Sequence, residues 1–389
     1  MGFFTGRVTC CRFRVSGNTP GMFGPEQLGQ LEEGMIGKQR VATGDGSQFG
    51  WVAGDHILDT RFDLAKNIIN DSLQFGMRVD EIKIPSDLLR AYYIVELEAL
   101  AAQNQSGHAS AKQKREARNI AKERLEQEAK DGRFVRRKAT PLLWDSPSNE
   151  LLVGTTSASV IDRLHSLFKE TFDRSLEFLG AGALAFAHAE VTQQTRSVDD
   201  ASPTSFVHGQ TEDIAWATDE HGRDFLGNEF LLWLWHTVEN ETDTIKLSDD
   251  SEVAIMFART LLLECPRGQY GRESFSSDGP TKLPEAHRAL QAGRLPRKTG
   301  LTLVRHDHPY ELTLQAETLA ISAAKLPVAE EEDERARLEE RVNQLRHMLE
   351  TVDLLYVAFL QRRLGEQWKQ ESSKIKKWLK GDIPHQAAG

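Results

Sequence analysis

Positive charge gathers in one stretch of an otherwise acidic chain, and phosphate binding is the chemistry that it could perform. The chain of 389 residues has a formal net charge of −10, yet residues 112–138 hold eleven Lys and Arg against five Asp and Glu. Clustered cations bind a nucleic-acid backbone by releasing its counterions. A helix that mixes Arg, Lys and Glu is also typical of a solvated face held by ion pairs, and both interpretations stay open. The candidate DNA-binding residues here are Lys112, Lys114, Arg115, Arg118, Lys122, Arg133, Arg136, Arg137 and Lys138.

A second group of cations follows a short helix expected at residues 284–292. Arg294, Arg297 and Lys298 come soon after Gly293, which can take the left-handed backbone conformation that ends a helix. We expect these three side chains on a short loop that leads into a strand, where they could contact phosphates. Cations near a helix C-terminus also stabilise the helix dipole, so a structural role stays open.

One short segment combines side chains that can bind a metal. His306 and His308 would share a face if the segment were a strand, but Asp307 and Pro309 favour a turn between two strands. The chain contains no Walker motif, serine nucleophile elbow or deaminase signature, and 58 scattered Asp and Glu do not identify a nuclease centre. We therefore predict no catalytic residue, no metal ligand and no cofactor. A metal-dependent DNA exonuclease is the enzymatic alternative.

The basic stretch falls mostly on the second of two expected helices. The first begins at Ser86 and carries apolar residues at helical spacing. A polar break around Gly107 separates it from the basic helix, which should end near Gly132. Only Ile120 and Leu125 are large and apolar in the basic helix. It can bury little surface, so we expect the helical pair to project from the body or to lean on a partner.

The rest of the chain predicts an α+β fold, with antiparallel sheets, flanking helices and a long C-terminal helix. Hairpins are expected within residues 140–157 and 301–315. Residues 225–239 are apolar on nearly all sides, which indicates a core helix. Residues 330–364 carry apolar side chains close to heptad spacing, which predicts a long helix. Five regions are expected: residues 1–85 (α+β), 86–138 (helical pair), 139–222 (hairpin, helix and loop), 223–329 (second α+β domain) and 330–389 (helix and tail).

Composition and cysteine use favour a cytoplasmic protein. No apolar run approaches the ~20 residues that span a bilayer, and the first residues lack the apolar stretch of a secretory signal. Cys10, Cys11 and Cys265 have no zinc-like spacing, so reduced thiols are the simplest interpretation. We expect no membrane association.

The order of segments resembles that of the RdgC family, bacterial recombination-associated DNA-binding proteins that are sometimes labelled exonucleases. The segments that carry the resemblance are Phe49-Gly50-Trp51-Val52, Lys83-Ile84-Pro85, Pro141-Leu142-Leu143-Trp144-Asp145, Phe230-Leu231-Leu232-Trp233-Leu234-Trp235, the stretch from Glu285 to Arg294, and Lys325-Leu326-Pro327. They follow one another in order over nearly the whole chain. Residues 192–222 and the tail from Trp368 depart from the compact members of the family.

The resemblance implies a two-fold symmetric, ring-shaped homodimer that encircles double-stranded DNA without reading its sequence. It also implies association with the nucleoid and restraint of RecA loading during recombination. Basic segments on an acidic body agree with such a ring, since phosphates would be attracted only through the hole. The helical pair and the long C-terminal helix are the candidates for closing the ring. A protein-interaction scaffold, whose charged helices bind other chains, is a further alternative.

Overall fold

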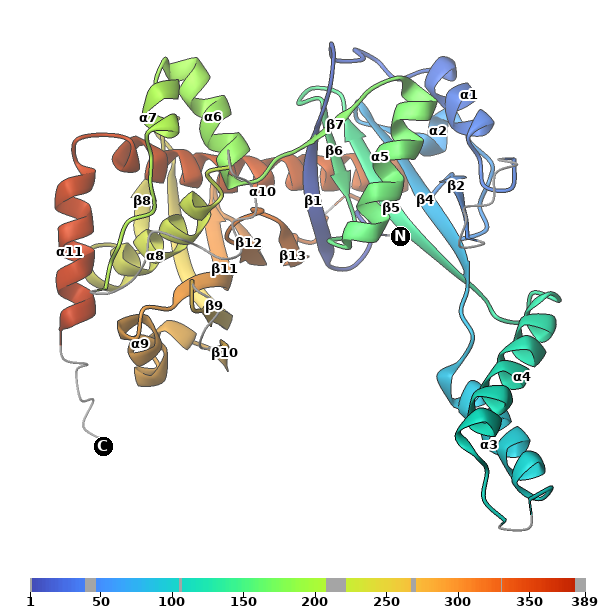
Figure 1. Cartoon of the computed structure of the whole chain (residues 1–389). Coiled ribbons are helices and arrows are strands. Elements are labelled where there is room, and N and C mark those ends of the chain that lie inside the picture. Colours follow the sequence, from blue (N-terminus) through green and yellow to red (C-terminus); the bar gives the residue numbers. More distant parts are fainter. Residues whose placement is uncertain are drawn as a thin grey trace. The chain divides into compact units, whose positions relative to one another are not determined.

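The computed structural model describes residues 2–38, 47–104, 107–207, 222–266, 271–329 and 331–381. Within these ranges the chain forms antiparallel strands with flanking helices, which confirms the predicted α+β class (Figure 1). No helix in these ranges combines the length and the apolar character needed to cross a bilayer. Part of the expected loop at residues 192–222 and the end of the tail lie outside the described residues.

The chain divides into two compact units that do not follow its order. One comprises residues 1–24, 64–74 and 141–389, and the other comprises residues 25–63 and 75–140. Strands β4 (Ser72–Ile82) and β5 (Val135–Asp145) each pass from one unit into the other. The units cut across the five expected regions, since residues 1–85 contribute to both. Strand pairing joins segments that are far apart in sequence, and local patterns do not reveal such pairing.

Antiparallel strand pairs form the frame of the larger unit. In the order in which they lie side by side, its main strands are β10 (Arg272–Ser277), β9 (Glu252–Glu264), β11 (Leu295–Arg305), β12 (His308–Gln315), β13 (Ile321–Lys325), β1 (Val8–Val15), β6 (Glu150–Val153) and the second half of β5. The short strands are β3 (Ile68–Ile69), β7 (Leu176–Phe178) and β8 (Thr244–Lys246). Leu142 of β5 lies opposite Val153 of β6, which confirms the hairpin expected within residues 140–157.

The helices of the larger unit are α2 (Leu64–Asn67), α5 (Ala158–Phe172), α6 (Ala181–Thr192), α7 (Thr195–Asp199), α8 (Phe225–Asn240), α9 (Pro284–Gln291), α10 (Glu334–Arg363) and α11 (Trp368–Lys380), with a 3₁₀ turn at Pro280–Lys282. The side chain of Asp333 caps α10 by accepting a hydrogen bond of 2.9 Å from Ala336 N. Most of the stripe predicted for this helix is buried, from Val342 to Phe359. The long helix therefore packs within its own unit.

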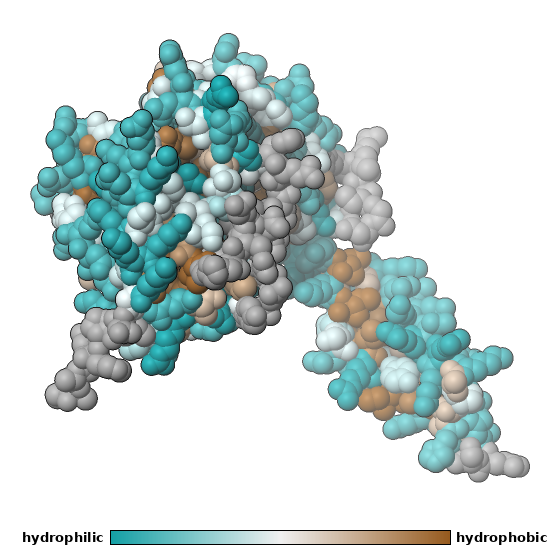
Figure 2. Space-filling model, turned by 60° about the vertical axis from the view of Figure 1, so that its left-hand side comes forward, coloured by the Kyte–Doolittle hydropathy of each residue, from teal (hydrophilic) through white to brown (hydrophobic). Residues whose placement is uncertain are grey.

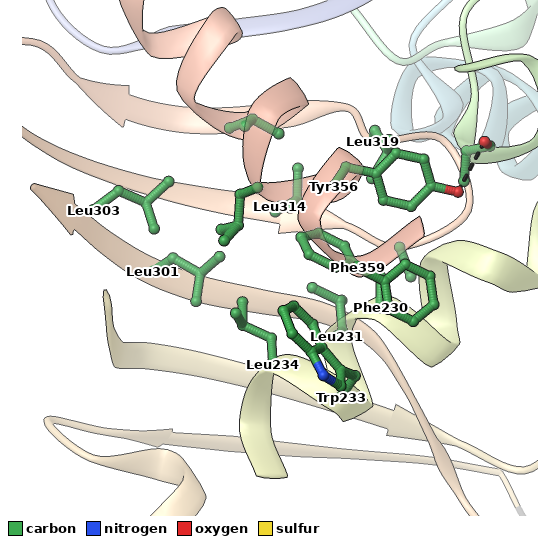
Figure 3. Packing of buried hydrophobic residues seen from close by; sticks show 14 of the residues in the cluster. Phe230, Leu231, Trp233, Leu234, Leu301, Leu303, Leu314, Leu319, Tyr356 and Phe359 are labelled. Carbon is green, nitrogen blue, oxygen red and sulfur yellow. Dashed lines mark hydrogen bonds between the residues drawn. The ribbon is translucent and has the colours of Figure 1, made fainter. Parts of the chain in front are cut away.

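Helix α8 lies in the core, as its all-round apolar sequence predicts. Its side chains from Phe225 to Thr237 are buried. They pack between β11 and α10, where the Phe230 ring lies 5.3 Å from that of Tyr356 (Figure 3). A Cβ at Gly227 would lie 1.8 Å from the carbonyl oxygen of Ala316, so only glycine allows this approach of helix and strand end. The tryptophans of α8 serve packing.

The turn between β11 and β12 forms at His306 and Asp307. Arg305 pairs with His308 across the hairpin, and both turn residues have positive φ, 49° and 63°. Two successive left-handed residues match the twist of the strands in a two-residue turn. The structure confirms the turn that the sequence predicts there.

The smaller unit contains the expected helical pair. Its elements are α1 (Pro25–Glu33), β2 (Gln48–Val52), most of β4, α3 (Ser86–Ala101), α4 (Ala111–Ala129) and the first half of β5. β2 pairs with β4 in antiparallel fashion, and the Trp51 and Phe75 rings pack at 5.2 Å. Helices α3 and α4 form an antiparallel hairpin (Figure 1). This hairpin positions the basic residues.

Candidate nucleic-acid interface

Helix α4 is a well-formed helix with clear local start and stop signals. Ser110 Oγ accepts a hydrogen bond from Gln113 N, and Gln113 Oε1 accepts one from Ser110 N at 2.9 Å. One face of the helix is buried and carries a residue at every fourth position, three of them small. These residues are Ala117, Ala121, Leu125 and Ala129. Gly132 has a φ of 81° just beyond the helix end. Small side chains let α4 approach α3 closely, and its long charged side chains therefore lie on the other faces.

Five predicted cations of α4 are exposed and have no carboxylate partner among the described residues. They are Lys112, Lys114, Arg115, Arg118 and Lys122. None of them forms an ion pair with another residue in the described part of the chain. Their positive charge is therefore available to an external anion, as the phosphate interpretation requires.

Three other cations of the basic stretch, Arg124, Arg133 and Arg137, follow the other interpretation. Arg133 contacts Asp131 and lies 3.4 Å from Glu128, and Arg137 Nε lies 3.5 Å from Asp80. The hydrogen bond from Arg133 lowers the pKa of the Asp131 carboxyl. Arg124, which sits over the Tyr92 ring at 4.2 Å, is also within reach of carboxylates. The basic stretch thus contains both kinds of surface that its sequence allows.

Two further predicted residues lie on the first half of β5. Arg136 and Lys138 are exposed, and neither forms an ion pair with a described residue. Arg137, between them, points its guanidinium toward Asp80. Successive strand residues face opposite ways, so Arg136 and Lys138 share a face. They form a second, smaller group of uncompensated cations in the same unit.

A groove of about 470 Å³ lies between α3 and α4. Leu89 and Tyr93 give it an apolar lining, and the cations Arg90, Lys114, Arg115 and Arg118 surround them. Arg90 is exposed and unpaired among the described residues. Sequence reasoning missed Arg90, because its role depends on which face of α3 meets α4. Four cations around one groove give it the positive charge that favours an anion.

Helix α3 also presents apolar side chains that no described residue of its own unit covers. None of its residues is buried, although apolar side chains make up most of its sequence. Ile94 and Val95 are 43% and 55% exposed. Figure 2 shows apolar and hydrophilic residues running side by side along the hairpin. A helix with this pattern is typical of an interaction surface.

The second predicted basic group has a different environment from the one expected. Arg297 and Lys298 belong to β11, so the prediction of a cationic loop is wrong, although Gly293 does end α9 with a φ of 87°. Arg294 lies 2.6 Å from Glu273, and Arg297 lies 2.9 Å from Glu264 and 2.6 Å from Glu317. These two arginine side chains are only 14% and 18% exposed. Lys298 is half-buried and forms no ion pair with a described residue.

The histidines of the β11–β12 turn meet a third histidine from α10. His306 Nδ1 lies 3.3 Å from His347 Nε2, and the Tyr310 hydroxyl lies 2.7 Å from His347 Nδ1. Burial and the nearby Arg305 lower the pKa of His347. No three His, Cys, Asp or Glu side chains of the described ranges converge as a metal ion would require. His347 is distant in sequence, and no local pattern links it to the turn.

Comparison with known proteins assigns no family to this chain: no family model matches it, and no curated protein is similar to it. The candidate interface therefore rests on its own residues. Its central feature is the groove between α3 and α4 with the uncompensated cations of α4.

Proposed function

We propose that this protein binds double-stranded DNA without reading its sequence, through the cationic surface of the α3–α4 hairpin. The observation that carries the proposal is the set of exposed α4 cations with no carboxylate partner among the described residues. A protein that keeps such charges uncompensated, on a chain of net charge −10, attracts a polyanion to one place and repels it elsewhere.

Backbone contact, rather than base reading, suits the residues that this surface offers. Lys114, Arg115 and Arg118 on one side of the groove and Arg90 on the other can reach phosphates along a strand. Reading bases in the major groove requires a helix with side chains that match particular base edges. The exposed residues of α4 are mainly Lys, Arg and Glu, and the sequence contains no known base-reading motif.

We further propose that two copies of the chain assemble as a homodimeric ring, as the resemblance to the RdgC family implies. The uncovered apolar side chains of α3, among them Ile94 and Val95, support a self-association surface. A C2 interface buries the same patch from both subunits, so this patch can form one contact of the dimer, and closing a ring requires a second self-complementary patch. In this arrangement apolar residues of the hairpin form one contact of the dimer, and its cations face DNA.

A ring on duplex DNA would occupy the substrate on which RecA filaments are loaded or extended. This proposal places the protein in the cytoplasm on the nucleoid, as a restraint on RecA-dependent recombination. It requires no catalysis. Binding that depends on phosphates alone agrees with a protein that must bind anywhere on a chromosome.

Fluorescence anisotropy with a labelled duplex tests the central claim. The variant Lys112→Ala/Lys114→Ala/Arg115→Ala/Arg118→Ala/Lys122→Ala should bind more weakly, and equally so for duplexes of different sequence. The slope of log Kd against log salt should flatten by about 0.9 for each phosphate that the variant no longer neutralises, or about 4.5 if all five residues neutralise one. Unchanged affinity and slope, with an unchanged circular dichroism spectrum, would contradict the proposal.

The same preparation separates the alternatives. Release of nucleotides from linear duplex in the presence of Mg²⁺ or Mn²⁺ would indicate an exonuclease. Wild-type protein with no salt-sensitive affinity for DNA would leave the protein-interaction scaffold as the better explanation.

A further inference from the structure

A pocket with an open volume of about 250 Å³ lies in the larger unit, between α10 and strands β1, β5 and β6. Most of the surface that lines it is apolar. Leu143 and Leu152 contribute from the strands, and Val342, Leu345, Leu349 and Val357 contribute from α10. An apolar cavity of about 150 Å³ can hold benzene, so this one has room for a ring with a short chain.

The pocket also holds an unusual ion-pair arrangement at Arg12. This side chain is 6% exposed and is shared by two carboxylates. It donates to Glu150 at 2.9 and 3.0 Å and to Asp353 at 2.5 and 2.7 Å. One guanidinium balances one carboxylate, so the triad carries one surplus negative charge.

The other charged residues of the pocket do not offset this surplus. Arg346 is engaged by Asp145, with 2.7 Å between Nη2 and Oδ1. Glu350 pairs with Arg305, which also contacts Asp249. Counted together, the pocket lining contains two arginines and four carboxylates. The pocket therefore has a negative electrostatic character with apolar walls.

A surplus negative charge beside apolar side chains is unfavourable, because few water molecules can solvate it. The effect is visible at Glu150, whose pKa burial raises although Arg12 opposes the shift. Asp353 is 32% exposed and each of its oxygens accepts one hydrogen bond from Arg12. A carboxylate oxygen has capacity for a second hydrogen bond, so Asp353 can accept from an incoming donor.

We propose that this pocket binds a small hydrophobic cation, a primary or secondary ammonium carried on an apolar body. The ammonium supplies the missing positive charge beside Asp353, and the apolar body lies against Leu345, Leu349 and Val357. An anion would meet arginines that are already paired. A neutral apolar molecule would leave the surplus charge of the triad without a partner.

Isothermal titration calorimetry at pH 7.5 and low salt tests this with three matched probes. 2-Phenylethylamine is the cation, 2-phenylethanol has the same ring and chain without charge, and 3-phenylpropionate is the anion. We expect the amine to bind at least tenfold more tightly than the alcohol and the anion to show no binding. Equal affinities for amine and alcohol, or no binding of the amine at millimolar concentration, would overturn the proposal, and this comparison needs only the wild-type protein.

Two variants locate the site. Asp353→Asn keeps the size of the side chain and removes the surplus charge, so it should abolish the preference for the amine over the alcohol. Glu190→Gln is the matched control, since it removes one exposed carboxylate of the same unit that does not line the pocket, and it should keep the preference. Amine binding that Asp353→Asn leaves unchanged would show that the cation binds elsewhere and would refute the site. Spermidine, a longer aliphatic cation, is expected to bind more weakly than 2-phenylethylamine. Equal or tighter binding of spermidine would indicate a general polyamine site and would contradict the requirement for a single compact apolar body.

Discussion

Arg297 Nε lies 2.6 Å from Glu317 Oε1, and its Nη1 lies 2.9 Å from Glu264 Oε2. Glu264 also lies 3.2 Å from Arg272, and Arg294 lies 2.6 Å from Glu273. Arg272, Arg297, Glu264 and Glu317 thus form one ion-pair network near the start of β11, and Arg294 and Glu273 form a further pair there. Burial raises the pKa of Glu317, and Arg297 opposes that shift, so the carboxylate depends on its arginine partner.

We predict that Arg297→Ala destabilises the fold without weakening DNA binding. Removing one partner of a largely buried ion pair leaves an uncompensated charge, which costs about 3 kcal/mol. Urea unfolding should show that decrease in stability, while the anisotropy titration should give a Kd within about twofold of wild type. Lys298→Ala is the matched control, because Lys298 has no ion pair among the described residues and its removal should change stability little. A large decrease in DNA affinity in Arg297→Ala at unchanged stability would instead place this group in the DNA-binding surface.

Cations of the basic stretch should differ in their contribution to DNA binding according to whether they are already paired. Lys114→Ala/Arg118→Ala and Arg133→Ala/Arg137→Ala each remove two positive charges. The first pair has no carboxylate partners in the described ranges, and the second contacts Asp131 and Asp80. We expect the first variant to weaken binding on the order of tenfold and to flatten the salt slope by about 1.8.

The variant Arg133→Ala/Arg137→Ala should change the DNA affinity and the salt slope much less, because its two arginines already contact carboxylates. Titrations of both variants between about 50 and 200 mM salt, on the same duplex, check the difference. Equal effects would mean that total charge, and not its local compensation, determines binding.

Ile94 and Val95 should contribute to self-association. Replacing both by Asp puts two charges on the apolar side of α3, which a second copy could bury only at a large desolvation cost. Sedimentation equilibrium should show that the wild-type protein is a dimer and that Ile94→Asp/Val95→Asp is shifted toward monomer. Ala91→Asp is a weaker test of self-association, since Ala91 offers a second copy little apolar area to bury. A variant that remains fully dimeric would move the interface away from this face of the hairpin.

Local sequence signals predicted several features of the structure. Gly132 and Gly293 lie where α4 and α9 end, and both have positive φ. The all-round apolar pattern of α8 identified a core helix, and Asp307 marked the turn of a hairpin. Each of these depends on neighbours a few residues away. Local patterns also gave the class of the fold, because periodicity distinguishes strands from helices.

Features that depend on long-range pairing were not predictable. Glu264 and Glu317 meet Arg297 only because β9 pairs with β11 and the chain returns after β12. The basic stretch showed a surplus of charge, but not that Asp80 compensates Arg137. Arg90 joins the groove because α3 and α4 lie side by side. Sequence patterns indicated which residues are charged, whereas the structure determines which charges are uncompensated.

Asp249 should make stability depend on acid pH. Hydrogen bonds from Ser251, and then the Arg305 guanidinium, lower the pKa of the Asp249 carboxyl from 3.8 to about 2. Because the pKa of the folded state lies below that of the unfolded state, Asp249 contributes stability that is fully present above pH 3.8 and disappears as the pH falls toward 2. We therefore expect Asp249→Asn to have a lower Tm than wild type at pH 7, and the gap should close between pH 4 and pH 2. Asp250→Asn is the control, since Asp250 is exposed and pairs only with Lys246 among the described residues, and it should leave Tm nearly unchanged at every pH. If the Tm difference between wild type and Asp249→Asn stays constant down to pH 2, the loss of hydrogen bonds accounts for the lower stability, and the ionisation of the carboxyl does not.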